Sequence, residues 1–122
     1  MTNATKKRLH DALPACRAIR AFTTGVAFAD YERNLEKRSA VERQLEIIGK
    51  ALGKAAAAEP TLAERLPELP RLVALRNRVI HGYDTVDDSI VWDIVQSKVP
   101  ELELALALLL DEEHGNEDAS RS

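Results

Sequence analysis

The sequence predicts an all-α protein, an up-and-down bundle of four to five helices joined by short connections. Two observations lead to this fold class. Apolar residues recur at spacings of three and four along each long segment, which is the period of an amphipathic helix. Proline, glycine and capping residues fall between these segments rather than within strand-like alternations. A chain of 122 residues is expected to form one domain with a sizeable core.

The first predicted helix has one apolar stripe made of Leu9, Leu13, Cys16 and Ile19. Pro14 lies inside this stretch, so it should kink the helix or mark its first turn. The sequence Thr-Thr-Gly at positions 23–25 is expected to end the helix.

A second, longer helix is predicted over residues 30–57, and Glu-Pro at positions 59–60 stops it. Arg38 interrupts its apolar face, where a hydrophobic residue is expected. The other positions of that face are Tyr31, Leu35, Val41, Leu45, Ile48 and Leu52.

Three further segments complete the bundle. Residues 61–64 have the pattern of a capping box that opens a short helix. Pro70 takes a first-turn position of the next helix, whose inner stripe is Leu72, Leu75 and Val79. The last helix is expected to start at Asp87 or Asp88 as N-cap, to be broken at Pro100 and to end near Leu110.

Composition restricts the class of protein. Hydrophobic residues make up 45% and charged residues 30%, as in an ordinary globular chain. We expect one domain over residues 1–110 and an acidic, disordered tail over 111–122. The longest apolar run has seven residues, 104–110, too few to span a bilayer, and no signal peptide is apparent. Cys16 is the single cysteine, so a reducing cytoplasm is the expected location.

The segment Arg76-Asn77-Arg78-Val79-Ile80-His81-Gly82-Tyr83 carries the candidate chemistry. On a helix, residues three and four apart share a face, so Asn77 and Arg78 would lie beside His81, with Arg76 at the edge. Arginine binds phosphoryl oxygens in a forked geometry, and imidazole exchanges protons near neutral pH. Such a set suits chemistry at a phosphate. The alternative is that these are solvated surface charges and that Tyr83 packs against the helix end.

The spacing Arg, four residues, His, one residue, Tyr resembles the motif of HepT-like HEPN proteins, ribonuclease-type toxins paired with minimal nucleotidyltransferase antitoxins. Residues 40–52, which contain Glu-Ile-Ile-Gly, resemble a second stretch of that family. Residues 67–70, 90–95 and 99–102 also match its pattern, in the right order. Lys50 departs from it, since a glutamate is common at that position.

The resemblance implies a metal-independent endoribonuclease that needs no cofactor of its own and leaves a 2′,3′-cyclic phosphate. Arg76 and His81 would be catalytic, Asn77 and Arg78 supporting or RNA-binding, and no metal ligand is expected. It also implies a homodimer with one composite cleft. The antitoxin would use ATP to adenylylate Tyr83, which places negative charge beside a site meant for an anion.

The overall charge leaves a second class of function open. Seventeen basic and 20 acidic residues give a net charge of −3, which does not fit a general nucleic-acid binder. Aromatic residues make up only 4% of the chain, so few side chains are available to stack on nucleic-acid bases. The chain could instead be a non-catalytic helical partner of a nucleotidyltransferase. A structural subunit of a larger complex is a third option.

Overall fold

The computed structural model describes residues 1–67, 69–70, 72–74 and 87–121, with side chains as far as residue 115. Every regular element in these residues is helical, which confirms the predicted all-α class. The elements are α1 (Asn3–Thr23), α2 (Phe28–Arg33), α3 (Leu35–Ala58), α4 (Leu62–Arg65), α6 (Asp88–Asp93), the π-helical segment η1 (Ile94–Lys98) and α7 (Val99–Arg121).

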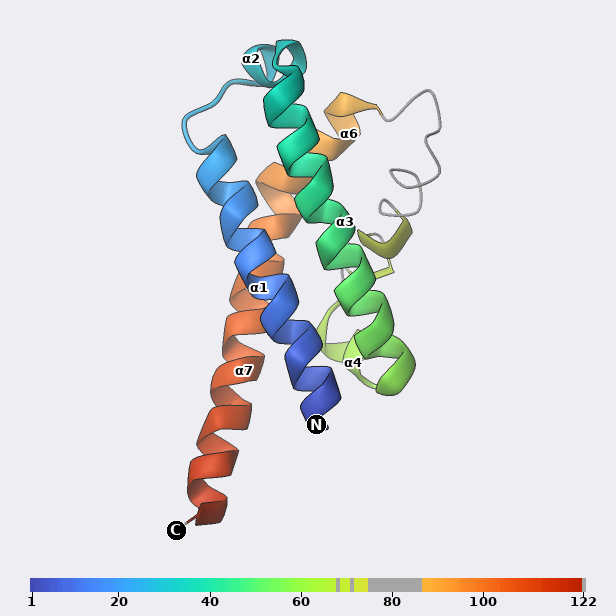
Figure 1. Cartoon of the computed structure of the whole chain (residues 1–122), viewed down its shortest axis with the longest axis vertical. Coiled ribbons are helices and arrows are strands. Elements are labelled where there is room, and N and C mark those ends of the chain that lie inside the picture. The colour runs from blue at the N-terminus through green and yellow to red at the C-terminus, as the bar shows by residue number, and fades with distance from the viewer. Residues whose placement is uncertain (68, 71, 75–86, 122) are drawn as a thin grey trace.

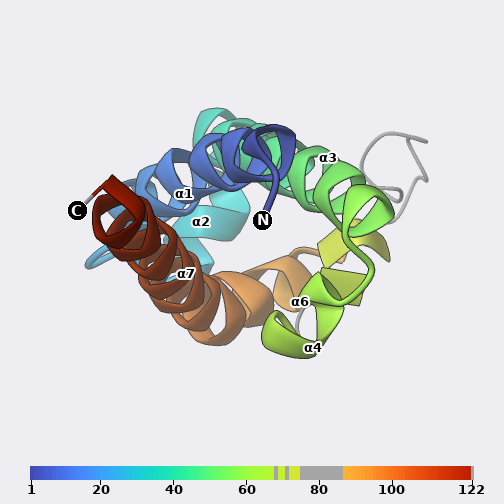
Figure 2. The same cartoon turned by 90° about the horizontal axis from the view of Figure 1, so that it is seen from below.

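Three long helices dominate the bundle. Helix α1 runs antiparallel to both α3 and α7 and packs against each of them (Figure 1). Seen end-on, α1 lies between α3 and α7, while α4 and α6 lie on the opposite side of the molecule (Figure 2). The last turns of α7 extend beyond the start of α1 (Figure 1).

Helix α1 is fixed at both ends. Its N-cap is Thr2, whose hydroxyl accepts a hydrogen bond from the Thr5 amide at 3.1 Å. At the other end Gly25 adopts a φ of +74°, which glycine reaches without steric cost, so the helix ends where the sequence predicts. Pro14 lies well inside the helix rather than in its first turn, and its side chain is exposed.

The predicted second helix is in fact two. Helix α2 ends at Arg33, and Asn34 separates it from α3. Asn34 acts as the N-cap of α3, since its side-chain oxygen accepts from the Lys37 amide at 3.0 Å. This break turns Leu35 to the surface, where 68% of it is exposed, so its predicted place in the apolar face is wrong.

One continuous core joins the helices. Its largest fully buried aliphatic side chains come from α1, α3, α6, η1 and α7 and from the segment after α4, and each stabilises the fold by roughly 1.5–3 kcal/mol. They are Leu9, Ile19, Val41, Leu45, Ile48, Leu52, Leu66, Leu72, Val91, Ile94 and Leu106. The predicted stripes of the first and second segments are therefore buried, apart from Leu35.

The C-terminal part continues as helix through Pro100. The Val99 amide donates to the Ile94 carbonyl, five residues back, which is the π-helical pattern. A proline at 100 cannot donate to the carbonyl four residues earlier, so a widened turn directly before it is a physically reasonable accommodation. Helix α7 continues to Arg121, whereas the sequence predicted a polar tail from residue 111.

The predicted capping box at residues 61–64 does not form. Helix α4 is present, but Thr61 has helical φ and ψ values and its side chain makes no capping hydrogen bond. Instead, the Glu64 amide donates to the Thr61 carbonyl at 3.2 Å, so the backbone alone closes this turn.

Candidate functional site

The motif residues Arg76, Asn77, Arg78, His81 and Tyr83 lie outside the described residues, and so do Leu75 and Val79. The structure describes the chain on both sides of them, up to Ala74 and again from Asp87. Those two flanks are the described parts of the chain that lie next to the motif in the sequence.

The flank before the motif is held to the core by leucines. Leu62, Leu66, Leu69 and Leu72 are all at least 94% buried, although they lie in short elements around α4. Val73 lies against α3, because a Cβ placed on Gly53 would be 3.9 Å from its Cγ2 atom. The chain therefore enters the motif segment from a position packed on the C-terminal half of α3.

The flank after the motif is held by an N-cap, and of the two predicted candidates, Asp87 and Asp88, the structure has Asp87 in this position. The Asp87 carboxylate accepts hydrogen bonds from the Ser89 amide at 2.9 Å and from the Ser89 hydroxyl at 2.6 Å. These two bonds favour the ionised carboxylate and lower the pKa of Asp87 below its ordinary value. The start of α6 is thus defined by side-chain chemistry within its first turn.

Arg38 ties this start to the rest of the bundle. A guanidinium nitrogen lies 3.8 Å from the Asp88 carboxylate in the first turn of α6. The same nitrogen donates to the Glu32 carbonyl near the end of α2. Arg38 therefore joins α2, α3 and α6, and its interruption of an apolar face has a structural cause.

Glu42 lies one turn further along α3, close to the same group of charges. Burial raises the pKa of the Glu42 carboxyl, the negative charge of Asp88 raises it further, and Arg38 opposes both effects. The charges of Arg38, Glu42 and Asp88 thus influence one another at the start of α6.

An aromatic cluster also joins α6 to α2. The Trp92 ring centroid lies 4.9 Å from that of Tyr31 and 6.1 Å from that of Phe28, both on α2 and both at tilted angles. Trp92 is partly buried and packs against the core. The Tyr31 hydroxyl is fully buried and has no hydrogen-bond partner among the described residues.

Other chemistries find little support in the described part of the chain. It contains no cluster of three or more histidine, cysteine, aspartate or glutamate side chains able to hold a metal ion. No helix in these residues is long and apolar enough to cross a membrane. His10 and His114 are exposed and lie on different helices.

Residues 12–109 match the family described as Ribonuclease HepT-like, a region that includes positions 76–83. The chain belongs to this family. The membership confirms the predicted resemblance and identifies the chain as an endoribonuclease of the HepT-like type.

Curated relatives agree with the assignment. A probable ribonuclease HepT from Thermococcus cleftensis is 33% identical over 105 residues, covering 84% of this chain and 92% of the relative. A candidate RNase from Methanocaldococcus jannaschii is 28% identical over 117 residues, covering 94% of both chains. A second one from the same organism is 32% identical over 94 residues and 75% of each chain. No solved structure matches the chain at a significant level.

The sequence did not predict the charged residues that meet at the start of α6. Arg38 was identified only as an interruption, and Glu42 and Asp88 were not connected to it. A cation inside an apolar stripe is itself a usable signal, because a half-buried arginine needs an anionic or carbonyl partner. The identity of that partner, 50 positions further along the chain, was not predictable from spacing.

Proposed function

We propose that this HepT-like ribonuclease is the toxin of a toxin–antitoxin pair and cleaves RNA without a metal ion. His81 takes the proton from a ribose 2′-hydroxyl, and the 2′-oxygen attacks the adjacent phosphorus. The bond from phosphorus to the 5′-oxygen then breaks, and that oxygen receives a proton. The products are a 2′,3′-cyclic phosphate and a free 5′-hydroxyl.

Arg76 stabilises the negative charge that develops on the phosphorane, and Asn77 orients the imidazole or the scissile phosphate. Arg78 contributes to RNA binding. One chain supplies a single imidazole at this motif, whereas the reaction needs both a base and an acid. A homodimer, with two motifs facing each other across a two-fold axis, would supply both.

Regulation would act on Tyr83. A minimal nucleotidyltransferase would transfer AMP from ATP to the phenol oxygen, with pyrophosphate leaving. The added phosphate puts negative charge and bulk two positions from His81, where RNA phosphate must bind. Adenylylation would therefore inhibit cleavage while leaving the fold intact.

The observation that carries this proposal is the family match across residues 12–109, which includes the complete Arg76, His81 and Tyr83 set. The packed flank at Leu72 and the capped, ion-paired start of α6 support it, because both ends of the motif segment are fixed to the bundle. Fixed ends limit the positions that a catalytic segment can take.

The test is RNA cleavage by the purified chain beside Arg76→Ala and His81→Ala, with the product 3′ ends identified. The intact mass of each sample shows whether Tyr83 is adenylylated. Cleavage to cyclic phosphates that is lost in both variants supports the proposal. If unmodified protein leaves a broad RNA pool intact, or if both variants cleave as well as the parent, the proposed mechanism fails.

A second candidate is a non-catalytic partner that docks onto a nucleotidyltransferase. The sequence of α7 favours it, because seven of the chain's 20 acidic residues lie in this one helix. Such a helix suits a basic protein surface better than RNA. Binding of the nucleotidyltransferase by a chain that shows no cleavage would support this alternative.

A further inference from the structure

The net charge of −3 conceals a strong separation of charge between helices. Helix α1 has five lysine and arginine residues and one acidic residue, and α3 has five and three. Helix α7 has seven acidic residues and one arginine. Helices α1 and α3 lie side by side (Figures 1 and 2), so ten basic and four acidic residues are brought together on two neighbouring helices of an acidic protein.

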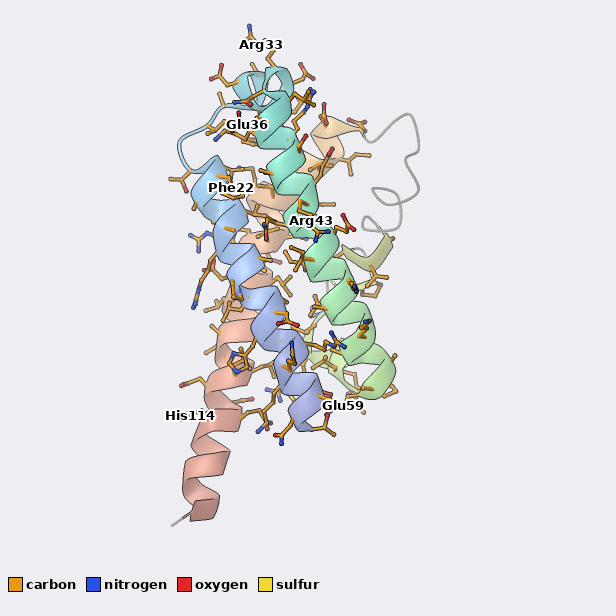
Figure 3. All side chains as sticks on the ribbon, in the orientation of Figure 1. Phe22, Arg33, Glu36, Arg43, Glu59 and His114 are labelled. Carbon is orange, nitrogen blue, oxygen red and sulfur yellow. The ribbon has the colours of Figure 1, made fainter. Side chains whose placement is uncertain are left out.

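A groove between α1 and α3 gathers part of this charge. Its volume is about 440 Å³, within the range of roughly 300–1,000 Å³ that is typical of ligand sites. Arg8, His10, Arg43 and Lys50 line it, together with two carboxylates and an apolar floor that includes Ile47. Arg43 lies about half-way along α3 (Figure 3).

The two carboxylates of the groove are already paired. Asp11 accepts from the Lys7 ammonium at 3.4 Å, and Glu46 lies 3.3 Å from the Arg43 guanidinium. Within the part of the chain that the structure describes, Arg8, His10 and Lys50 form no ion pair. The uncompensated charge of the groove is therefore positive.

Two cations at the other end of α1 share one carboxylate of α7. Arg17 lies 3.5 Å from the Glu103 carboxylate of α7, and Arg20 pairs with the same group. Glu103 thus holds α7 against α1 and offsets part of the positive charge of this end. Among the described residues, the groove is therefore a part of the α1–α3 face where cations from both helices remain available to a ligand.

We propose that this groove binds the phosphodiester backbone of the RNA substrate, outside the motif segment, through Arg8 and Lys50. This inference rests on the proposed function. Unpaired cations from two helices match the repeated charges of a nucleic-acid strand, and binding releases the counterions condensed on it. Arg43 remains ion-paired with Glu46. Ile47 offers an apolar surface to a ribose or base. A polyanion fits the groove better than a protein surface, because its free charges are all of one sign.

The experiment measures binding of a fluorescent single-stranded RNA that carries 2′-O-methyl groups and therefore cannot be cleaved. The variants are Arg8→Glu, Lys50→Glu and, as the matched control, Lys54→Glu. Lys54 is an exposed lysine one turn further along α3 that does not line the groove. Circular dichroism of each variant establishes that it is folded.

We expect Arg8→Glu and Lys50→Glu each to weaken binding by about tenfold and to reduce the salt dependence of log Kd by about one. Lys54→Glu should stay within about twofold of the parent. Equal losses in all three variants would mean that only overall charge matters, and this would overturn the proposed site. Unchanged RNA binding in Arg8→Glu and Lys50→Glu would also overturn it, including the case in which these variants lose a nucleotidyltransferase instead.

Catalysis is read separately, so the two proposals can fail independently. Cleavage of a long RNA by the control variant Lys54→Glu should match that of the parent. For the same RNA, the KM of Lys50→Glu should rise. If the parent cleaves RNA and Lys50→Glu shows the parental KM, the groove proposal fails and the nuclease stands. If the parent cleaves no RNA but binds it through Arg8 and Lys50, the groove proposal stands and the proposed nuclease activity fails.

Discussion

A guanidinium nitrogen of Arg38 lies 3.8 Å from the carboxylate of Asp88 and links the middle of the bundle to the first turn of α6. Both side chains are about three-quarters buried. The contact lies five positions after Tyr83 in the sequence, so it fixes the point where the chain returns from the motif segment.

The Arg38–Asp88 pair should contribute measurably to stability. We expect a double-mutant cycle of Arg38→Ala and Asp88→Asn to give a coupling of about 0.5–1 kcal/mol, the upper range for partly exposed pairs. Urea unfolding of the four proteins measures it. The pair Arg43–Glu46, on the same helix but with Arg43 64% exposed, is the control and should give less than half of this value.

The same contact should matter for activity if it positions the motif segment. RNA cleavage by Arg38→Ala should fall, and Arg38→Lys should retain an intermediate rate because it keeps the charge but loses the forked geometry. Full activity in Arg38→Ala, in a protein shown to be folded, would contradict a positioning role.

Glu42 should make stability depend on pH. Its pKa is raised in the folded state, so the folded protein binds this proton more tightly than the unfolded chain does. The contribution of this proton to the free energy of unfolding is fully present below the unfolded pKa of about 4.3. It is lost as pH rises through the higher pKa of Glu42 in the folded state. Glu42→Gln removes this loss, so its Tm relative to the parent should be higher at pH 7 than at pH 4.

Thermal unfolding of both proteins at the two pH values checks this sign. Glu36→Gln, an exposed position of the first turn of α3, is the control and should show no such difference. A Glu42→Gln variant that loses stability as pH rises from 4 to 7, relative to the parent, would contradict the buried, like-charged environment of Glu42.

Two leucines of α7 that are two positions apart differ in burial. Leu106 is fully buried and Leu104 is 63% exposed. Leu106→Ala should lower the free energy of unfolding by about 2–5 kcal/mol, because it leaves a cavity in a packed core. Leu104→Ala should change it by less than about 0.5 kcal/mol in the monomer. A large loss from Leu104→Ala, dependent on protein concentration, would show that this face is covered by a second chain.

Cys16 should be unreactive while the protein is folded. Its side chain is fully buried in α1, and burial, reinforced by the negative charge of Glu103, raises the pKa of the thiol to about 12. We expect no reaction with a thiol-specific reagent at pH 8 until denaturant is added, and then one thiol per chain. Rapid labelling in the native state would show that α1 opens easily from the bundle.

The sequence by itself determined the helical class, the buried stripes of the first two segments apart from Leu35, and an N-cap at Asp87 or Asp88. These are local properties, set by spacings of three and four residues and by the chemistry of one capping carboxylate. The motif spacing and its flanking stretches also identified the family from the order of residues alone. Such features need no knowledge of which helix packs against which.

Only the tertiary structure decided how distant charges combine. Arg38 meets Asp88 across 50 positions, and Arg17 and Arg20 meet Glu103 across more than 80. The break at Asn34 turned Leu35 outward, although a continuous helix would have placed it in the apolar face. The groove between α1 and α3 likewise depends on how two helices pack. Ion pairing and exposure are set by neighbours that are remote in sequence, so periodicity along the chain cannot supply them.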